Sequence, residues 1–229
     1  MGGKNHQPCK HYLLNSTRLS RHLSLAYGHL EFGNAALEDI LIIELSPDRD
    51  PQGAVESYQA IRRELAVSGT ELGHAKLALA ALRQQMDETG FADLPTLGKI
   101  DLSQIGQSLA ESGMVNLAAW KQVHELMKAG GFYAMVARFD ADIDELGALN
   151  RALQAKFAQL ESPVTAGILT DIVEENRPES FKPEFAALYA KWTEMNGLFL
   201  ASSLMSTELW YAFTGKGTLA PTAMQLRAA

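Results

Sequence analysis

The chain has 229 residues, of which 47% are hydrophobic and 21% are charged. These proportions are typical of a globular protein and exclude wholesale disorder and a fibrous repeat. The formal net charge of −7 argues against nucleic-acid binding through the surface as a whole. The single cysteine, Cys9, excludes an intramolecular disulfide framework and a multi-cysteine zinc site.

The charge is distributed unevenly along the chain. Residues 1–30 contain Lys4, Lys10, Arg18 and Arg21 and no acidic residue. Such a basic arm can contact anionic lipid or nucleic acid, although the acidity of the remaining chain counts against this. The same residues contain no apolar core of the signal-peptide type, and we expect a cytoplasmic protein.

Apolar residues at helical spacing predict a first helix over residues 16–45. Its main stripe begins at Leu19 and Leu23 and continues in steps of three and four residues. A second apolar stripe predicts that this helix is deeply buried; the stripe consists of Leu25, His29, Phe32, Ala36 and Ile43. Pro47 and Pro51 predict a break after it.

The second predicted helix, which ends at Gly90, has the clearest pattern of the chain. Nine residues follow a heptad register through four repeats and are expected in the core: Tyr58, Ile61, Leu65, Ser68, Leu72, Ala75, Leu79, Leu82 and Met86. Gly69 and Gly73 lie beside this seam, where they can let a neighbouring backbone come close.

The remaining pattern predicts a third helix from Asp101 or Ser103 to Gly130–Gly131, a fourth over 132–160, a short helix over 163–175 and a last long helix over 185–213. Asn150 takes a seam position of the fourth helix, where a buried asparagine would fix the register. The apolar segment 197–213 is too short and too rich in serine and threonine for a membrane span.

We therefore expect an all-α fold, an antiparallel bundle of about five long helices plus one short helix. We expect residues 1–229 to form a single domain, with residues 1–15 and 216–229 flexible or loosely docked.

Motifs of the common catalytic classes are missing from the sequence. It contains no phosphate-binding glycine loop, no HExxH and no GxSxG. Asp140, Asp142 and Asp144 imitate the start of a calcium loop, but Glu145 replaces its glycine and Arg151 its final glutamate. We expect these aspartates to form a solvated helix face.

Glu71 and His74 form a Glu-x-x-His pair, which places both side chains on one face of a helix. Metal-binding bundles use such pairs as ligands. If the first two helices pack antiparallel with their turn centred on residue 49, His29 lies level with this pair. If the second and third helices pack antiparallel with their turn centred on residue 95, His124 lies within about a turn and a half of it. The sequence thus predicts His29, Glu71, His74 and His124 as candidate metal ligands.

These observations support two main hypotheses. The first is a helical-bundle binding or protein-interaction module, whose heptad seams pair within the chain or between chains in self-association. The second is a bundle that binds a transition metal or haem, with an oxidase as one version of it, since nitrogen and carboxylate donors suit such groups. His22, one heptad before His29, is a further candidate axial ligand for haem. Against the second hypothesis, His29 and His124 lie on apolar stripes, which is typical of core histidines.

Overall fold

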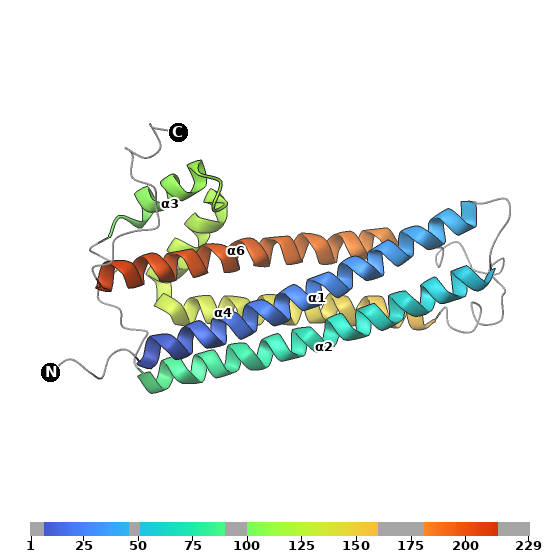
Figure 1. Ribbon diagram of the computed structural model, residues 1–229, viewed down its shortest axis with the longest axis horizontal. Helices are drawn as coiled ribbons and strands as arrows, with labels where there is room; N and C mark the ends of the chain where they lie inside the picture. The colour runs from blue at the N-terminus through green and yellow to red at the C-terminus, as the bar shows by residue number, and fades with distance from the viewer. Residues whose placement is uncertain (1–6, 46–50, 90–99, 160–180, 215–229) are drawn as a thin grey trace. The chain divides into compact units, whose positions relative to one another are not determined.

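The computed structural model describes residues 7–45, 51–89, 100–159 and 181–214. Within these ranges it is 95% helical and has no strand, which confirms the all-α prediction. The helices are α1 (Gln7–Leu45), α2 (Pro51–Thr89), α3 (Leu102–Glu111), α4 (Leu117–Ala158) and α6 (Lys182–Thr214) (Figure 1). The predicted break at Pro47, the short helix over 163–175 and the tail over 216–229 lie outside the described residues.

Local sequence signals set several helix ends. Pro51 takes the first position of α2, where an amide hydrogen would have no partner inside the helix. Asp101 caps α3 by accepting hydrogen bonds from the amides of Ser103 and Gln104, and Asn116 caps α4 in the same way. The prediction that Asp101 can begin a helix is confirmed.

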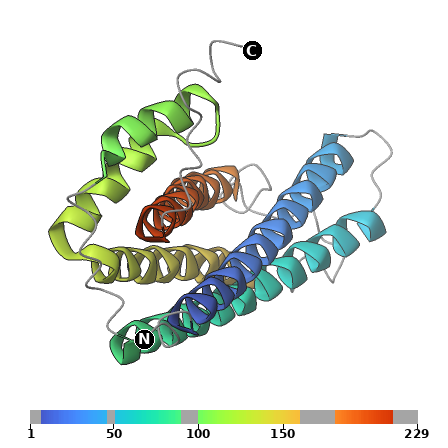
Figure 2. The same cartoon turned by 60° about the vertical axis from the view of Figure 1, so that its left-hand side comes forward.

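The predicted third helix is wrong in its middle. It is divided at residues 112–116, because Gly113 adopts a φ of 73° and closes the end of α3. The predicted end of this third helix at Gly130–Gly131 is confirmed. Gly130 and Gly131 have non-helical dihedral angles inside α4, and Gly131 has a positive φ of 60°, which glycine adopts without strain (Figure 2).

The chain divides into two compact units, each built from separate stretches of sequence. The first unit contains residues 1–12, 82–141 and 193–229, and the second contains residues 13–81 and 142–192. The single-domain expectation stays a prediction. The candidate site described below lies within the second unit.

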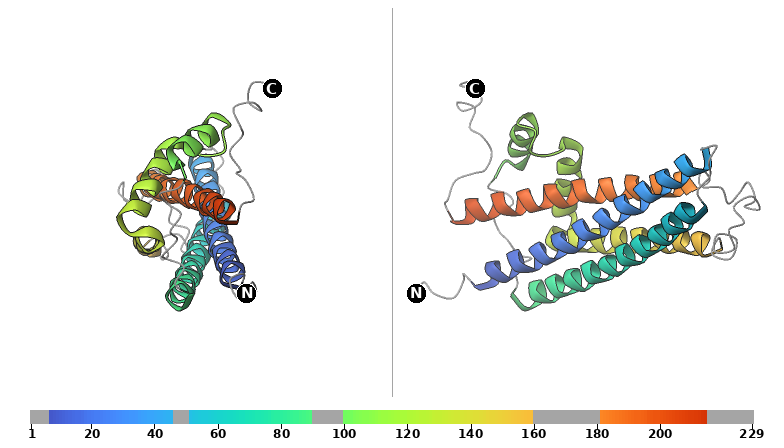
Figure 3. Two further views of the ribbon diagram at one scale, coloured as in Figure 1. Left: turned by 90° about the vertical axis from the view of Figure 1, so that its left-hand side faces the viewer. Right: turned by 45° about the vertical axis from the view of Figure 1, so that its right-hand side comes forward.

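Neighbouring helices of the second unit run antiparallel. Ser68 of α2 contacts Ala26 of α1, and Glu64, further back along α2, contacts His29, further forward along α1. Residue numbers that rise on one helix therefore fall on the other. The helix pairs α2–α4, α4–α6 and α6–α1 are antiparallel as well (Figure 3). The contacts that show this are Lys76–Asp144 and Tyr58–Phe157 between α2 and α4, Lys191–Glu145 and Lys156–Glu184 between α4 and α6, and Tyr27–Tyr189 and Glu38–Lys182 between α6 and α1.

Both long seams are buried as predicted. All nine heptad residues of α2 are buried, from Tyr58 to Met86, and Leu65 and Ile61 are fully covered. The α4 seam from Phe132 to Phe157 is also buried, and Asn150 within it is 1% exposed. The heptad register therefore identified the core faces of both helices.

The predicted deep burial of α1 is wrong for its second stripe. Leu25 is 39% exposed and Phe32 is 66% exposed, while His29 and Ala36 are half-buried. In the second unit α1 contacts α2 and α6, which cover the side that carries Leu19, Leu23 and Ala26. Apolar spacing does not reveal that the opposite side has no neighbour among the described residues of the unit.

The expectation of a solvated aspartate face is wrong for Asp142. Its side chain is 3% exposed and lies 2.7 Å from Nζ of Lys191, which also lies 2.6 Å from Oε2 of Glu145. Because Lys191 supplies a compensating charge, the carboxylate of Asp142 can be buried at an otherwise apolar interface. Asp144, in contrast, is exposed.

The glycines beside the α2 seam differ in their surroundings. A Cβ atom on Gly69 would lie 3.2 Å from the side chains of Asn150 and Gln154, so Gly69 makes room for a polar pair rather than for a backbone. A Cβ atom on Gly73 would meet nothing within 4 Å. No helix in the described ranges combines the length and apolarity of a membrane span.

Candidate metal centre

A cluster of two histidines and one glutamate lies between α1 and α2. Nδ1 of His22 donates a hydrogen bond of 2.6 Å to Oε2 of Glu71. Nδ1 of His74, one helical turn after Glu71, lies 3.7 Å from the other carboxylate oxygen. The imidazole centroids of His22 and His74 are 5.1 Å apart. Both rings therefore converge on a single carboxylate.

This cluster is partly shielded from solvent. The side chains of His22 and Glu71 are 27% and 17% exposed, and that of His74 is 47% exposed. The hydrogen bond from His22 lowers the pKa of Glu71 below its ordinary value of 4.5, whereas burial acts in the opposite direction and the charges of both histidines add to the lowering. Glu71 is thus an anion over the neutral pH range.

The three side chains have the donor chemistry of a transition-metal site. One ligand atom from each residue can be chosen such that all three lie within 4.8 Å of one another. Zinc ligands at 2.0–2.2 Å in tetrahedral geometry lie about 3.3 Å apart, so small side-chain rotations would bring these atoms to ligating positions. Two imidazoles and one carboxylate also leave at least one coordination position open.

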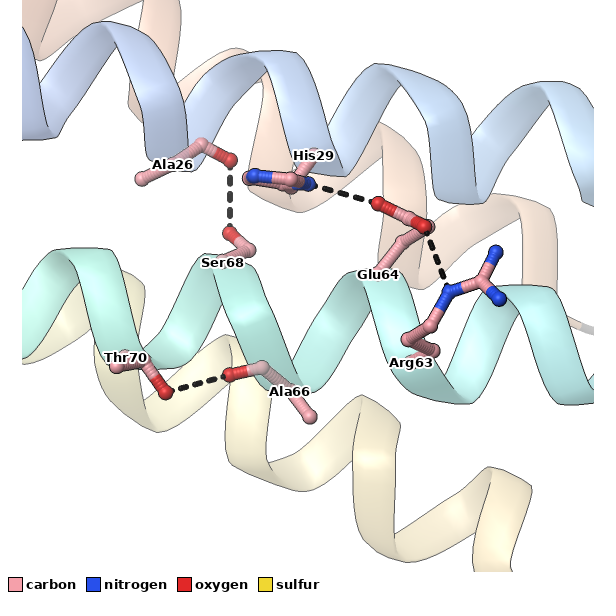
Figure 4. Close-up of polar contacts among 7 residues, drawn as sticks. All are labelled: Ala26, His29, Arg63, Glu64, Ala66, Ser68 and Thr70. Atoms are coloured by element: carbon pink, nitrogen blue, oxygen red, sulfur yellow. Dashed lines mark hydrogen bonds and ion pairs between the residues drawn. The ribbon is translucent and has the colours of Figure 1, made fainter.

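A second histidine–glutamate pair repeats the first one heptad away. Nδ1 of His29 donates to Oε2 of Glu64 at 2.7 Å, and His29 and Glu64 are each seven residues from His22 and Glu71. Between the two pairs, Oγ of Ser68 donates to the carbonyl oxygen of Ala26 at 2.8 Å. Figure 4 shows this second pair beside the serine contact.

We call the His22–Glu71 pair the first layer and the His29–Glu64 pair the second layer. The two layers differ in their third residue. Val67 is one heptad before His74 and so takes the corresponding position in the second layer. Valine offers no lone pair to a metal. The second layer has an imidazole and a carboxylate but lacks the third donor of the first.

The predicted site residues lie in different places. Glu71 and His74 lie together, and His22, predicted only as an axial ligand, joins them. His29 is outside this cluster and contacts Glu64. His124 belongs to the first unit, where burial lowers its pKa and Lys128 adds to the effect. That these residues hold a metal stays a prediction.

The register used to group these residues is wrong by more than a helical turn. An antiparallel pair of helices with its turn centred on residue 49 would place His29 level with residue 69, but His29 contacts Glu64. In the second unit the α4 residue next to Gly69 is Asn150, rather than a residue of the 102–130 segment. Connection lengths and helix ends determine this register, and neither follows from apolar spacing.

Sequence reasoning missed Glu64. The signal that could have found it is a matched spacing, because His22 and His29 are seven residues apart and Glu64 and Glu71 are also seven apart. Two such pairs on antiparallel helices meet only in one register, in which each histidine faces one glutamate. That register is the one in the structure.

A groove of about 550 Å³ lies elsewhere in the second unit, between α2 and α4. Seven residues line it, and most of the lining surface is apolar: Gln59, Arg62, Arg63, Ala66, Gln154, Ala155 and Ala158. None of the three cluster residues lines it, so it is separate from the candidate metal centre.

No protein-family model matches the chain, and comparisons with curated proteins and with solved structures give no match.

Proposed function

We propose that the chain is a metal-binding helical bundle that holds one divalent transition-metal ion through His22, Glu71 and His74. The observation that carries the proposal is the convergence of three donor atoms from two helices within 4.8 Å. The depressed pKa of Glu71 adds support, because an ionised carboxylate is the form that ligates.

Binding would require His22 to change its tautomer. The hydrogen on Nδ1 of His22 points at Glu71. For Nδ1 to become a ligand beside the carboxylate, this hydrogen would move to Nε2, and the imidazole would stay neutral. His74 supplies the third donor, and water fills the remaining position.

The donor set favours a bare ion over haem. Two axial imidazoles of a haem lie on opposite faces of the macrocycle, whereas His22 and His74 approach the same carboxylate. Nitrogen and oxygen donors of this kind suit zinc, copper, nickel or ferrous iron. We assign binding and no reaction.

Zinc titration of the full chain, prepared without a histidine tag, tests this function. Calorimetry should show one equivalent of Zn²⁺ bound to the unaltered protein. His74→Val should weaken binding by about 100-fold or more, since it removes one of three protein ligands.

His29→Val is the matched control, because it removes an imidazole from the layer that lacks a third donor. It should leave zinc affinity unchanged within about twofold. Equal effects of the two substitutions, or zinc binding that survives both His74→Val and Glu71→Gln, would refute the proposal.

We also propose a cytoplasmic location and association with a partner through exposed apolar residues. The acidic composition, with a net charge of −7, supports the first. The exposed apolar residues of α1 support the second.

A further inference from the structure

The side of α1 that faces away from the core carries a regular pattern of its own. Six residues follow steps of four and three, which defines the outer face of α1: Arg21, Leu25, Gly28, Phe32, Ala35 and Asp39. Leu25 and Phe32 are the large apolar residues of this face, at 39% and 66% exposure. Such spacing is that of a helix-pairing seam.

This face is complementary to itself when two copies run antiparallel. Its N-terminal end is basic, at Arg21, and its C-terminal end is acidic, at Asp39. An antiparallel arrangement sets Arg21 opposite Asp39 twice, once on each side of a two-fold axis. A parallel arrangement would set arginine against arginine and aspartate against aspartate.

Side-chain size is complementary in the same register. With Arg21 opposite Asp39, Leu25 lies opposite Ala35 and Phe32 lies opposite Gly28. The largest side chain of the face thus meets the position without a side chain, and the next largest meets an alanine. Each contact occurs twice in a two-fold pair.

Gly28 has no explanation within the part of the chain that the structure describes. A Cβ atom at this position would meet nothing within 4 Å, and glycine inside a helix costs about 0.5–1 kcal/mol relative to alanine. A second copy supplies a reason, because Phe32 of that copy needs the space.

We propose that the outer face of α1 is the interface of an antiparallel homodimer, in which Phe32 of each copy packs over Gly28 of the other. This face shares no residue with the candidate metal centre, so the pairing does not depend on metal binding. The partner is a second copy of this chain, because both the charge pattern and the size pattern are self-complementary.

Sedimentation analysis of the full chain over a range of concentrations tests the dimer. The unaltered protein should dimerise, and Gly28→Gln should weaken the dimer by at least about tenfold because it fills the space for Phe32. Gly28→Gln has open space in the single chain, so circular dichroism should show an intact fold. Gly73→Gln, at the open glycine of α2, is the matched control and should leave the dimer unchanged.

Charge reversal tests the orientation. Arg21→Asp and Asp39→Arg should each weaken the dimer, since each sets like charges opposite one another at two places. The double variant should restore dimerisation to within about threefold. A monomer at all concentrations up to about 500 µM, a dimer that tolerates Gly28→Gln, or a double variant without rescue would each overturn the proposal. The proposal is also overturned if the protein is a monomer and another segment or another protein covers Phe32.

Discussion

The indole of Trp120 occupies the place where a side chain on Gly106 would stand. A Cβ atom on Gly106 would lie 2.1 Å from Nε1 of Trp120. The same nitrogen donates a hydrogen bond of 2.8 Å to the carbonyl oxygen of Leu102. Trp120 is 1% exposed, so its ring is covered by surrounding residues. This contact fixes α3 against the start of α4 within the first unit.

Gly106→Ala should therefore destabilise the protein by roughly 1–3 kcal/mol or more, because the indole must shift and its hydrogen bond is lost. The free energy of unfolding in denaturant measures this effect. Gly73→Ala, at a helical glycine with open space, should instead stabilise by about 0.5–1 kcal/mol. Equal effects of the two substitutions would contradict the close approach of Trp120.

The α2 seam offers a second stability test. Leu79 is 1% exposed and Leu77, two residues earlier, is 69% exposed. Leu79→Ala should lower the free energy of unfolding by roughly 2–5 kcal/mol, since it leaves a cavity in the core. Leu77→Ala should change the free energy of unfolding by less than about 0.5 kcal/mol. A loss below about 0.5 kcal/mol for Leu79→Ala would mean that the seam is assigned to the wrong face.

Glu64 predicts a specific dependence of stability on pH. The hydrogen bond from His29 lowers the pKa of Glu64 below 4.5, burial opposes this, and Arg63 adds to the lowering. A depressed carboxylate pKa stabilises the fold at pH values above the unfolded-state pKa, and this stability is lost as the pH falls through the folded-state pKa. The stability difference between the unaltered protein and Glu64→Gln should be constant above about pH 5 and shrink below about pH 4. A pH-independent difference in urea titrations would contradict the lowered pKa of Glu64.

Val67→His should create a second metal site. The substitution gives the His29–Glu64 layer the third donor that His74 provides one heptad later. Zinc stoichiometry by calorimetry should then rise from one to two equivalents. Adding His29→Val should return it to one. A stoichiometry that stays at one in Val67→His would show that the third donor does not distinguish the two layers.

Periodic burial is the part of the fold that the sequence predicted well. Every seam residue of α2 from Tyr58 to Met86 is buried, because one helix face must meet the core whichever helices supply it. The exposure of Phe32 was missed because the outward side of α1 has the same apolar spacing as the inward side. A pattern on one helix contains no information about which of its sides receives a neighbour.

The candidate site was predicted only in part for a related reason. Glu71 and His74 lie on the same helix, so their proximity follows from helix geometry alone. The partners from α1 depend on how far two helices slide along each other. An error of about five residues selected His29 in place of His22, although both histidines were visible in the sequence.

Within the second unit, α1 packs against α2, α2 against α4, α4 against α6 and α6 against α1. This closed arrangement has a consequence for the order of folding. α1 and α2 are separated only by residues 46–50, so their contacts close a short loop. α6 must return to α1 from the far end of the chain, which closes a much longer loop at a greater entropic cost. We therefore expect the α1–α2 hairpin, together with the His22–Glu71 pair, to form early and the α1–α6 contacts of Tyr27 to form late. A metal ion that binds the hairpin could then act on the chain before the bundle is complete.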